Sequence, residues 1–496
     1  MQRTAPATSA GGKAEGSFLA TRRGKLILAL LCSVAFLDFV DASIVNVALP
    51  DIRKDLHFSV QGLQWVPSGY LLTYGGFMLL GGRIADLLGR RRVLVTGTIL
   101  IGIFSLIGGM AQDAGVLIGA RLAQGLGAAL MLPAALSILT TTYTEGSERN
   151  KALGAWGGVG GLASAVGVFL GGVLTEGPGW RWVMYVNPLA CLLVLPAVFW
   201  LIPGERHRAR LVDFDVTGSV LATGGMLLLV YGLVKAPDQG FGSGRTILEL
   251  AGAVVLLAAF VVAEYASRKP LLPLTVFRIK GLAAADVTQL IAFAGFLAMF
   301  FFLTLYMQNV LGYSPIRSGL AYLPLCFGVG MSAGISSALL ARVGTKPMMV
   351  VGSVVAAGGV FWLSRIPVDG SFLSDLLPGM MIMSLGLGAV FVAVTTAANA
   401  GVPSDKAGLA AALLNACQQV GGALGLAIFS AVATARTNHL VSMHAAVPDA
   451  LTSGFRRALF VGSMFLLASA VIALRTRNVR SAPSAPTAAL AVPDPS

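Results

Sequence analysis

Two acids lie in one of the most apolar stretches of the chain. Residues 34–50 read VAFLDFVDASIVNVALP, with Asp38 and Asp41 in the middle. The two positions are three residues apart, so on a helix they share one face. Ionisable side chains inside an apolar span are costly and typically mark an ion or substrate pathway. The pair predicts a site for a proton or a cation inside a membrane; the alternative is a structural pair that caps packed helices.

The elements that must position these acids are long and apolar. Of the 496 residues, 56% are hydrophobic and 11% are charged, whereas soluble domains carry about 25% charged residues. Apolar segments of about 20 residues recur, each long enough to cross a bilayer core of about 30 Å. The composition predicts an all-α membrane protein. Its fourteen transmembrane helices are expected near residues 26–49, 63–82, 93–112, 116–139, 152–174, 182–202, 216–234, 248–266, 283–311, 319–341, 348–363, 376–398, 409–435 and 458–474.

The positive charges predict the orientation in the membrane. With the N-terminus inside, the inner segments hold 24 of the 35 Lys and Arg residues, the outer segments hold 10, and Arg121 lies within a span. Positive residues are retained on the cytoplasmic side of a membrane. We therefore expect a multi-pass protein of the cytoplasmic membrane with both termini in the cytoplasm. The net charge of +13 indicates contact with anionic lipid rather than nucleic acid.

The predicted spans divide into two six-helix halves, residues 22–205 and 282–478. Spans seven and eight are an inserted pair of linker helices, and with their loop they occupy residues 206–281. Residues 1–21 and 479–496 are expected to be disordered cytoplasmic tails. No G-x-x-x-x-G-K-[ST] phosphate loop occurs in the sequence, so uphill transport would have to use an ion gradient. The layout is compatible with secondary transporters built from repeats.

An arginine in the fourth span supplies a partner for the acids. Arg121 lies about 8 Å below the outer end of its span, and Asp41 lies about 12 Å below the outer end of the first span. These depths allow an ion pair that would hold Asp41 ionised. Asp38 lies about 16 Å down, with less compensation, and is expected to take up a proton more readily. Snorkelling of Arg121 to the outer surface is the alternative.

Further polar side chains lie inside the predicted spans. Asn415, Gln418 and Gln419 would face a cavity from the second half or only bridge helices. Asp286 lies near the cytoplasmic end of the ninth span, where it is expected to be interfacial.

The loop GGRIADLLGRRR, residues 81–92, combines glycines, one acid and four arginines. Asp86 can accept hydrogen bonds at a helix start, and Arg90 or Arg91 can bridge helix ends. Simple anchoring by positive charge would explain the arginines, but not the spacing of Gly82, Asp86 and Gly89. The loop is therefore predicted to gate the cytoplasmic side.

The fifth span reads GAWGGVGGLASAVGVFLGGVL and holds eight glycines from Gly154 to Gly172. Such a face allows very close helix approach. It is either a generic packing surface or an interface that moves during a functional cycle.

These stretches resemble the major facilitator superfamily, and more closely its fourteen-span drug:proton antiporter family. Residues 81–92 are similar to the motif G-x-x-x-D-R-x-G-R-[RK]-[RK], with Leu87 in place of a basic residue. LIGARLAQGLGAA, residues 117–129, resembles L-x-x-x-R-x-x-Q-G-x-G-A-A and includes Arg121 and Gln124. VDASIVNVALP resembles L-D-x-T-x-x-N-x-A-L-P. Three further stretches, residues 180–189, 306–315 and 415–425, also look like this family.

One motif departs from the family pattern. The fifth helix of the antiporters ends in G-P-x-x-G-G, whereas this chain has Val168 where proline is usual and Ala163 where a glycine is usual. The matching glycines are Gly154, Gly167, Gly171 and Gly172. In the family this motif goes with export, and the missing proline weakens that inference.

The resemblance implies the major facilitator fold and proton-coupled export of amphipathic drugs or antibiotics. Asp38, Asp41 and Arg121 would couple proton and substrate, and Gln124, Asn415, Gln418 and Gln419 would line the cavity. The expected partners are protons, membrane lipid and a small organic substrate that can be cationic; nucleic acid is not expected, and the protein should act as a monomer. The alternatives are a dedicated exporter of one natural product and, third, a non-transporting membrane sensor. An enzyme is not expected, because no Ser/His, paired-metal or H-E-x-x-H arrangement occurs, and neither a cofactor nor a metal is predicted.

Overall fold

The computed structural model describes residues 18–480, apart from 145–146, 205–215, 241, 268–278, 280, 401 and 403–406. The described part contains fourteen helices of 19 residues or more, and no strand. They are α1 (Arg22–Asp55), α3 (Trp65–Leu88), α4 (Arg90–Gly109), α5 (Ala114–Thr142), α6 (Ser147–Glu176), α7 (Arg181–Leu201), α8 (Val216–Gln239), α9 (Gly244–Ala266), α10 (Leu282–Asn309), α11 (Pro315–Val343), α12 (Thr345–Leu363), α13 (Leu377–Asn399), α14 (Ala407–Ser442) and α15 (Val447–Ala473). Short turns of helix precede α1 (Phe18–Ala20), α3 (α2, Val60–Leu63) and α13 (Phe372–Leu376).

Local sequence signals set several of these boundaries. Thr21 caps α1 by accepting a hydrogen bond from the Gly24 amide at 3.0 Å. Asp113 caps α5 by accepting from the Val116 amide at 3.0 Å. Such side chains satisfy amides that have no partner within the helix. Two glycines separate consecutive helices: Gly89 between α3 and α4, with φ 99°, and Gly344 between α11 and α12, with φ 88°. Few side chains tolerate that conformation, so both turns favour glycine.

Twelve of the fourteen long helices are long and apolar enough to cross a membrane. The other two, α3 and α8, are each 24 residues long and pack within the same bundle. The number of predicted spans thus equals the number of long helices, and the predicted all-α fold is correct. Burial varies strongly among them: 78% of the apolar window of α10 is buried inside the protein, against 11% for α9.

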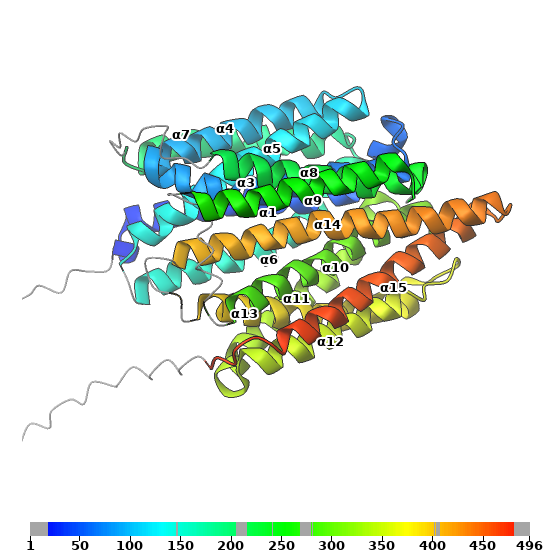
Figure 1. Ribbon diagram of the computed structural model, residues 1–496. Coiled ribbons are helices and arrows are strands. Elements are labelled where there is room, and N and C mark those ends of the chain that lie inside the picture. Colours follow the sequence, from blue (N-terminus) through cyan, green and yellow to red (C-terminus); the bar gives the residue numbers. More distant parts are fainter. Residues whose placement is uncertain are drawn as a thin grey trace, which may run out of the picture.

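The long helices run roughly along one direction, so the bundle has two ends (Figure 1). α1 begins and α15 ends at the same end, which we call the near end; α1 ends and α10 ends at the far end.

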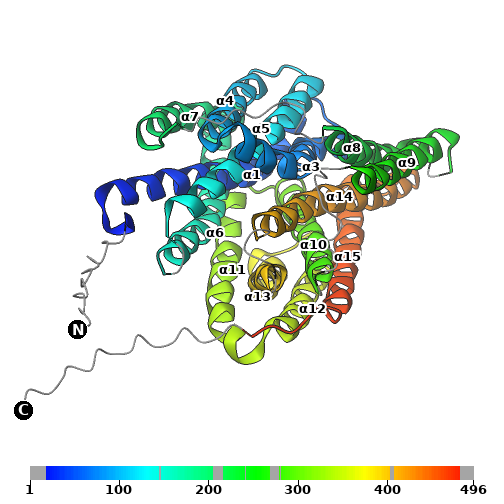
Figure 2. The ribbon, with the colours of Figure 1, turned by 60° about the vertical axis from the view of Figure 1, so that its left-hand side comes forward.

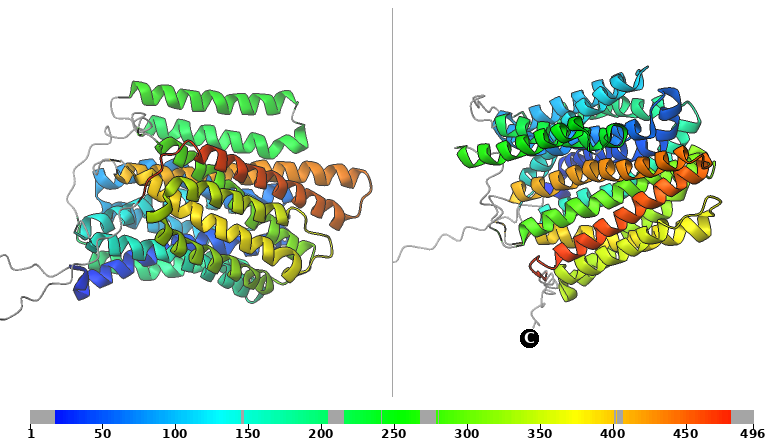
Figure 3. Two further views of the ribbon diagram at one scale, coloured as in Figure 1. Left: turned by 90° about the horizontal axis from the view of Figure 1, so that it is seen from below. Right: turned by 45° about the vertical axis from the view of Figure 1, so that its right-hand side comes forward.

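Helix contacts form two sets. α1 and α3–α7 pack among themselves, as do α10–α15, and the sets meet where α6 contacts α11, α3 contacts α14 and α1 contacts α10. Figure 2 shows the two sets side by side. The inserted pair α8 and α9 lies on the outside of the bundle (Figure 3), where α8 contacts both α3 and α14.

Candidate functional site

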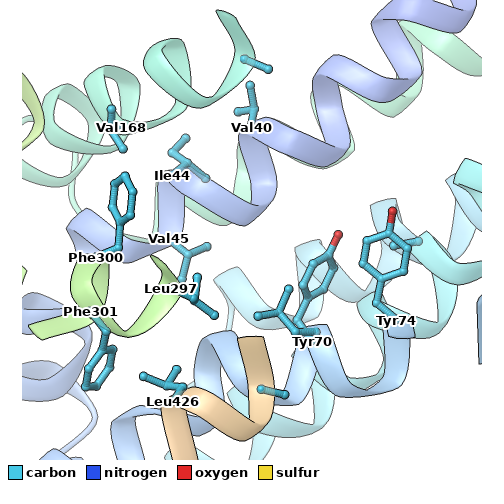
Figure 4. Packing of buried hydrophobic residues seen from close by; sticks show 14 of the residues in the cluster. Val40, Ile44, Val45, Tyr70, Tyr74, Val168, Leu297, Phe300, Phe301 and Leu426 are labelled. Carbon is cyan, nitrogen blue, oxygen red and sulfur yellow. The ribbon is translucent and has the colours of Figure 1, made fainter. Parts of the chain in front are cut away.

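Asp38 lies deep in α1, where its side chain meets two tyrosines of α3. The residue is 4% exposed. The Tyr70 hydroxyl donates a hydrogen bond to Asp38 Oδ1 at 2.8 Å, and the Tyr74 hydroxyl donates to Oδ2 at 3.0 Å. The tyrosines are four residues apart, so they share one face of α3, and their hydroxyls point the same way in Figure 4. Sequence reasoning missed both, although their spacing within a span was the available signal.

Asp41 is held in a different way. Its Oδ2 accepts a hydrogen bond from Arg121 Nη1 of α5 at 2.8 Å, and the two side chains are 3% and 1% exposed. Its Oδ1 accepts a hydrogen bond from Asn187 Nδ2 of α7. The ion pair expected from the depths of Asp41 and Arg121 is therefore present, and the snorkelling alternative for Arg121 is wrong.

Arg121 makes several further contacts. Its Nε donates to the Val66 carbonyl at 3.1 Å, and Nη1 also donates to Gln124 Oε1 at 3.3 Å. Its guanidinium lies 4.3 Å from the centre of the Tyr70 ring, within range of a cation–π interaction. A buried cation with this many partners holds a defined position. Arg121 therefore links the surroundings of the two acids, because Tyr70 contacts both it and Asp38.

A second layer of polar groups supports the ion pair. Asn187 Nδ2 also donates to Ser105 Oγ of α4 at 2.8 Å, and Gln124 Nε2 donates to the same oxygen. Ser105 Oγ thus accepts hydrogen bonds from both side-chain amides, that of Asn187, which contacts Asp41, and that of Gln124, which contacts Arg121. Asn187 occurs in one of the resembling stretches, yet its type alone did not reveal this contact.

A cavity of about 60 Å³ lies between the two sets of helices, beside Asp38. It has room for a few water molecules, far less than the 300–1,000 Å³ or so that pockets for organic ligands offer. Its lining comes from α1, α3, α5, α10 and α14: Asp38, Phe39, Ala42, Pro67, Tyr70, Leu71, Tyr74, Arg121, Leu132, Phe293, Leu297, Asn415, Gln418 and Gln419. A substrate of drug size requires this space to widen.

Some of the site residues predicted from sequence line this cavity, and others do not. Asn415, Gln418 and Gln419 border this cavity, and Asp38 borders it whereas Asp41 does not. The prediction that Gln124 lines it is wrong. Its side chain is fully buried against Arg121 and Ser105, because it lies on the α5 face that turns toward α4 and α7.

The loop between α3 and α4 ties helices of the first set together. Arg90 Nη1 donates to Thr141 Oγ1 of α5 at 3.0 Å, and Arg91 Nη2 donates to the Phe199 carbonyl of α7 at 3.2 Å. A Cβ at Gly82 would meet only Pro133, at an ordinary 3.7 Å. The Asp86 side chain lies outside the described parts. The gating role of Gly82, Asp86, Gly89, Arg90 and Arg91 stays a prediction.

The glycines of α6 do not form one uniform surface. A Cβ at Gly167 would strike the Ser43 hydroxyl, and one at Gly171 would lie 2.5 Å from the Ile44 carbonyl, so both serve the packing on α1. A Cβ at Gly172 would lie 2.8 Å from Ile316 Cα of α11, in the other set of helices. Gly154 has no neighbour within 4 Å of such a Cβ. The four motif glycines therefore have three different surroundings.

Replacing Gly172 by alanine should disfavour this contact between the sets. An inserted methyl group in a packed interior costs about 1–3 kcal/mol, so the ratio of molecules closed at the far end to molecules open there should fall about fivefold or more. Gly154→Ala is the matched control, since it gives the same gain in helix propensity without a clash. The access of a thiol reagent to a cysteine placed at the far end measures this ratio. Equal labelling of both variants would contradict the assignment.

Among the described residues, no group of three or more His, Cys, Asp and Glu side chains could hold a metal ion. The free cysteines are Cys32, Cys191, Cys326 and Cys417.

Comparison with known proteins identifies the family to which this chain is similar. Residues 31–426 match the family model described as Major Facilitator Superfamily. The chain is 38% identical over 457 residues to the puromycin resistance protein of Streptomyces alboniger, covering 90% of each chain. It is 36% identical over 467 residues to the cephamycin export protein of Amycolatopsis lactamdurans, covering 93% of this chain and 94% of that protein.

Solved structures share the fold. A bacterial homologue of the human lysosomal transporter Spinster, in an inward-facing and occupied conformation, aligns with a TM-score of 0.66 at 16% identity, covering 92% of this chain and 98% of that chain. A proton-dependent oligopeptide transporter aligns with a TM-score of 0.60 at 14% identity, covering 91% and 98%. With the family match over most of its length, this chain belongs to the major facilitator superfamily.

Proposed function

We propose that the protein is a proton-coupled secondary exporter of amphipathic drugs or antibiotics across the cytoplasmic membrane. One observation carries the proposal: two neighbouring buried acids on α1 have opposite environments. Asp38 borders a cavity between the two sets of helices, whereas Asp41 lies outside its lining and is neutralised by Arg121. One acid is thereby available for exchange while the other orders the site.

The chemistry at Asp38 is a competition between a proton and a substrate. An ionised Asp38 accepts hydrogen bonds from both tyrosines and attracts a cationic or donor-bearing substrate. A proton on Asp38 removes that charge and weakens the hold on the substrate. Because the two ligands prefer different states of one carboxyl group, binding of each opposes the other. The fixed positive charge of Arg121 lies close enough to Tyr70 to bias this balance.

Alternating access requires the two sets of helices to move against each other. Residues 22–205 and 282–478 are proposed to be the moving halves, with residues 206–281 as the inserted pair. At the far end, Gln308 Nε2 of α10 donates to the Val47 carbonyl of α1 at 2.9 Å, and the Ile316 amide of α11 donates to Glu176 Oε2 of α6 at 3.1 Å. These bonds must break when the cavity opens toward that end. The near end, where positive charge is concentrated, is assigned to the cytoplasm.

The names of the relatives support export of an antibiotic. They also supply the second candidate, a dedicated exporter, because the two relatives described above are each named for one compound. Breadth of substrate separates the two: an assay with a panel of dyes and antibiotics would find one accepted compound for a dedicated exporter and several for a drug exporter.

Uptake into everted membrane vesicles tests the proposal. Vesicles with an acidic interior should accumulate substrate against its gradient, a protonophore should abolish the accumulation, and ATP in the presence of that protonophore should not restore it. Vesicles without the protein are the control. Accumulation that survives the protonophore, or that needs ATP alone, would refute proton coupling.

A further inference from the structure

A third acid lies buried in the second set of helices. Asp286 is 2% exposed and lies in the first turns of α10, so at the cytoplasmic end expected from sequence its side chain is enclosed by protein. Both carboxyl oxygens are inaccessible, and neither has a hydrogen-bond partner among the described residues. Native proteins rarely leave a buried carboxyl group in this condition, and such a group requires an explanation.

Few ionisable groups surround Asp286. The Cys417 thiol of α14 lies near enough to interact with it electrostatically. α13 has no charged residue. On α1, Asp38 and Asp41 are bonded toward α3, α5 and α7. Besides Cys417, the ionisable residues of α11, α14 and α15, and of the segment after α15, are Arg317, Tyr322, Cys326, Arg342, Arg436, His439, Asp449, Arg456, Arg457, Arg475, Arg477 and Arg480. None of them makes a salt bridge to Asp286 in the described structure.

A polar connection runs from the central cavity toward this acid. Gln418, which borders the cavity, accepts a hydrogen bond from Gln289 Nε2 at 2.8 Å. Gln289 is three residues after Asp286 and shares its face of α10. The Gln289 Oε1 atom is also buried and has no hydrogen-bond partner among the residues described. Three buried acceptor atoms on one face of α10 therefore have no donor within the part of the chain that the structure describes, and this face adjoins the site where Asp38 lies.

A proton accounts for this arrangement. An ionised carboxylate without a partner in an apolar interior is strongly disfavoured, and a bound proton removes the charge and turns one acceptor into a donor. Release of this proton from Asp286 requires that the carboxyl group come into contact with water. The α3–α14 packing beside the cavity is close, since a Cβ at Gly75 would lie 3.0 Å from Gln419 Cβ. Separation of α3 from α14 would open a path for water along Gln418 and Gln289.

We infer that Asp286 is a second proton carrier of the transport cycle, located in the half opposite Asp38. It holds a proton in the described conformation, returns it to water on the cytoplasmic side when α3 and α14 separate, and regains one from water on the outer side. The inference rests on the proposed proton-coupled export, and it predicts two protons for each substrate molecule. At a pH difference of about one unit, each coupled proton multiplies the attainable substrate ratio about tenfold.

Proteoliposomes containing the full chain test the stoichiometry. Asp286→Asn, which resembles the protonated acid in shape, should lower the proton-to-substrate ratio from two to one and the accumulation plateau about tenfold at a pH difference of about one unit. Asp286→Glu should retain the wild-type ratio. Asp449→Asn, which removes an exposed acid at the start of α15, is the matched control and should change neither value. An unchanged ratio in Asp286→Asn would overturn the inference.

Infrared difference spectra separate this inference from the proposed function. Purified wild-type protein taken through a pH series should show a protonated-carboxyl band that is missing from Asp286→Asn and present in Asp449→Asn. This readout does not require transport, so it stands even if no proton-coupled uptake is found. Identical spectra for wild type and Asp286→Asn would show that Asp286 does not exchange a proton.

Discussion

Replacing Asp38 by asparagine should abolish uphill efflux while leaving downhill passage of substrate. The amide is similar in size to the acid and can still accept a hydrogen bond from Tyr70 or Tyr74, so the cavity should keep its shape. It cannot ionise, so proton and substrate no longer compete for one group. The proton on Asp286 would then move without being linked to substrate. We expect accumulation in vesicles to fall to the level set by passive equilibration.

Substrate-induced proton release from purified protein checks the same variant directly. Wild type should release protons on binding substrate over a range of pH, and Asp38→Asn should release none from this site. Asp51→Asn is the control, because Asp51 is also on α1 but does not border the cavity. Undiminished release from the Asp38→Asn, Asp41→Asn double variant would place the coupling outside the α1 pair.

Removing the charge of Arg121 should be more damaging to folding than to chemistry. Arg121→Gln leaves Asp41 buried with only Asn187 as a partner, and breaking a buried ion pair from one side costs about 3–5 kcal/mol. It also removes the hydrogen bond to the Val66 carbonyl and the contact with the Tyr70 ring. The variant should therefore unfold at a clearly lower temperature in detergent than the wild type.

The double variant Arg121→Gln, Asp41→Asn provides the control for this explanation. With both charges removed, no unpaired ion stays buried, so part of the lost stability should return and the two substitutions should not be additive. Thermal unfolding of wild type, both single variants and the double variant completes the cycle. Additive losses would mean that the ion pair contributes nothing beyond the packing of its two side chains.

The sequence by itself determined the elements and the depth of their polar residues. Low charge content and recurring apolar segments predicted fourteen long helices, because a bilayer sets the length of each span. Depth follows from the constant rise of a helix, which is why Asp41 and Arg121 could be matched across two spans. The motifs of the first, fourth and fifth spans, read together, pointed to the correct superfamily.

Only the tertiary structure decided which way each of these side chains faces. Asp38 and Asp41 share a helix face in sequence, yet Asp38 borders the cavity, whereas Asp41 does not and is paired with Arg121. Gln124 was misplaced for the same reason. Depth along a helix depends on residue number alone, whereas exposure depends on how the helix is rotated and which helices surround it. That rotation results from packing between segments far apart in the chain, as where the glycines of α6 meet α1 and α11.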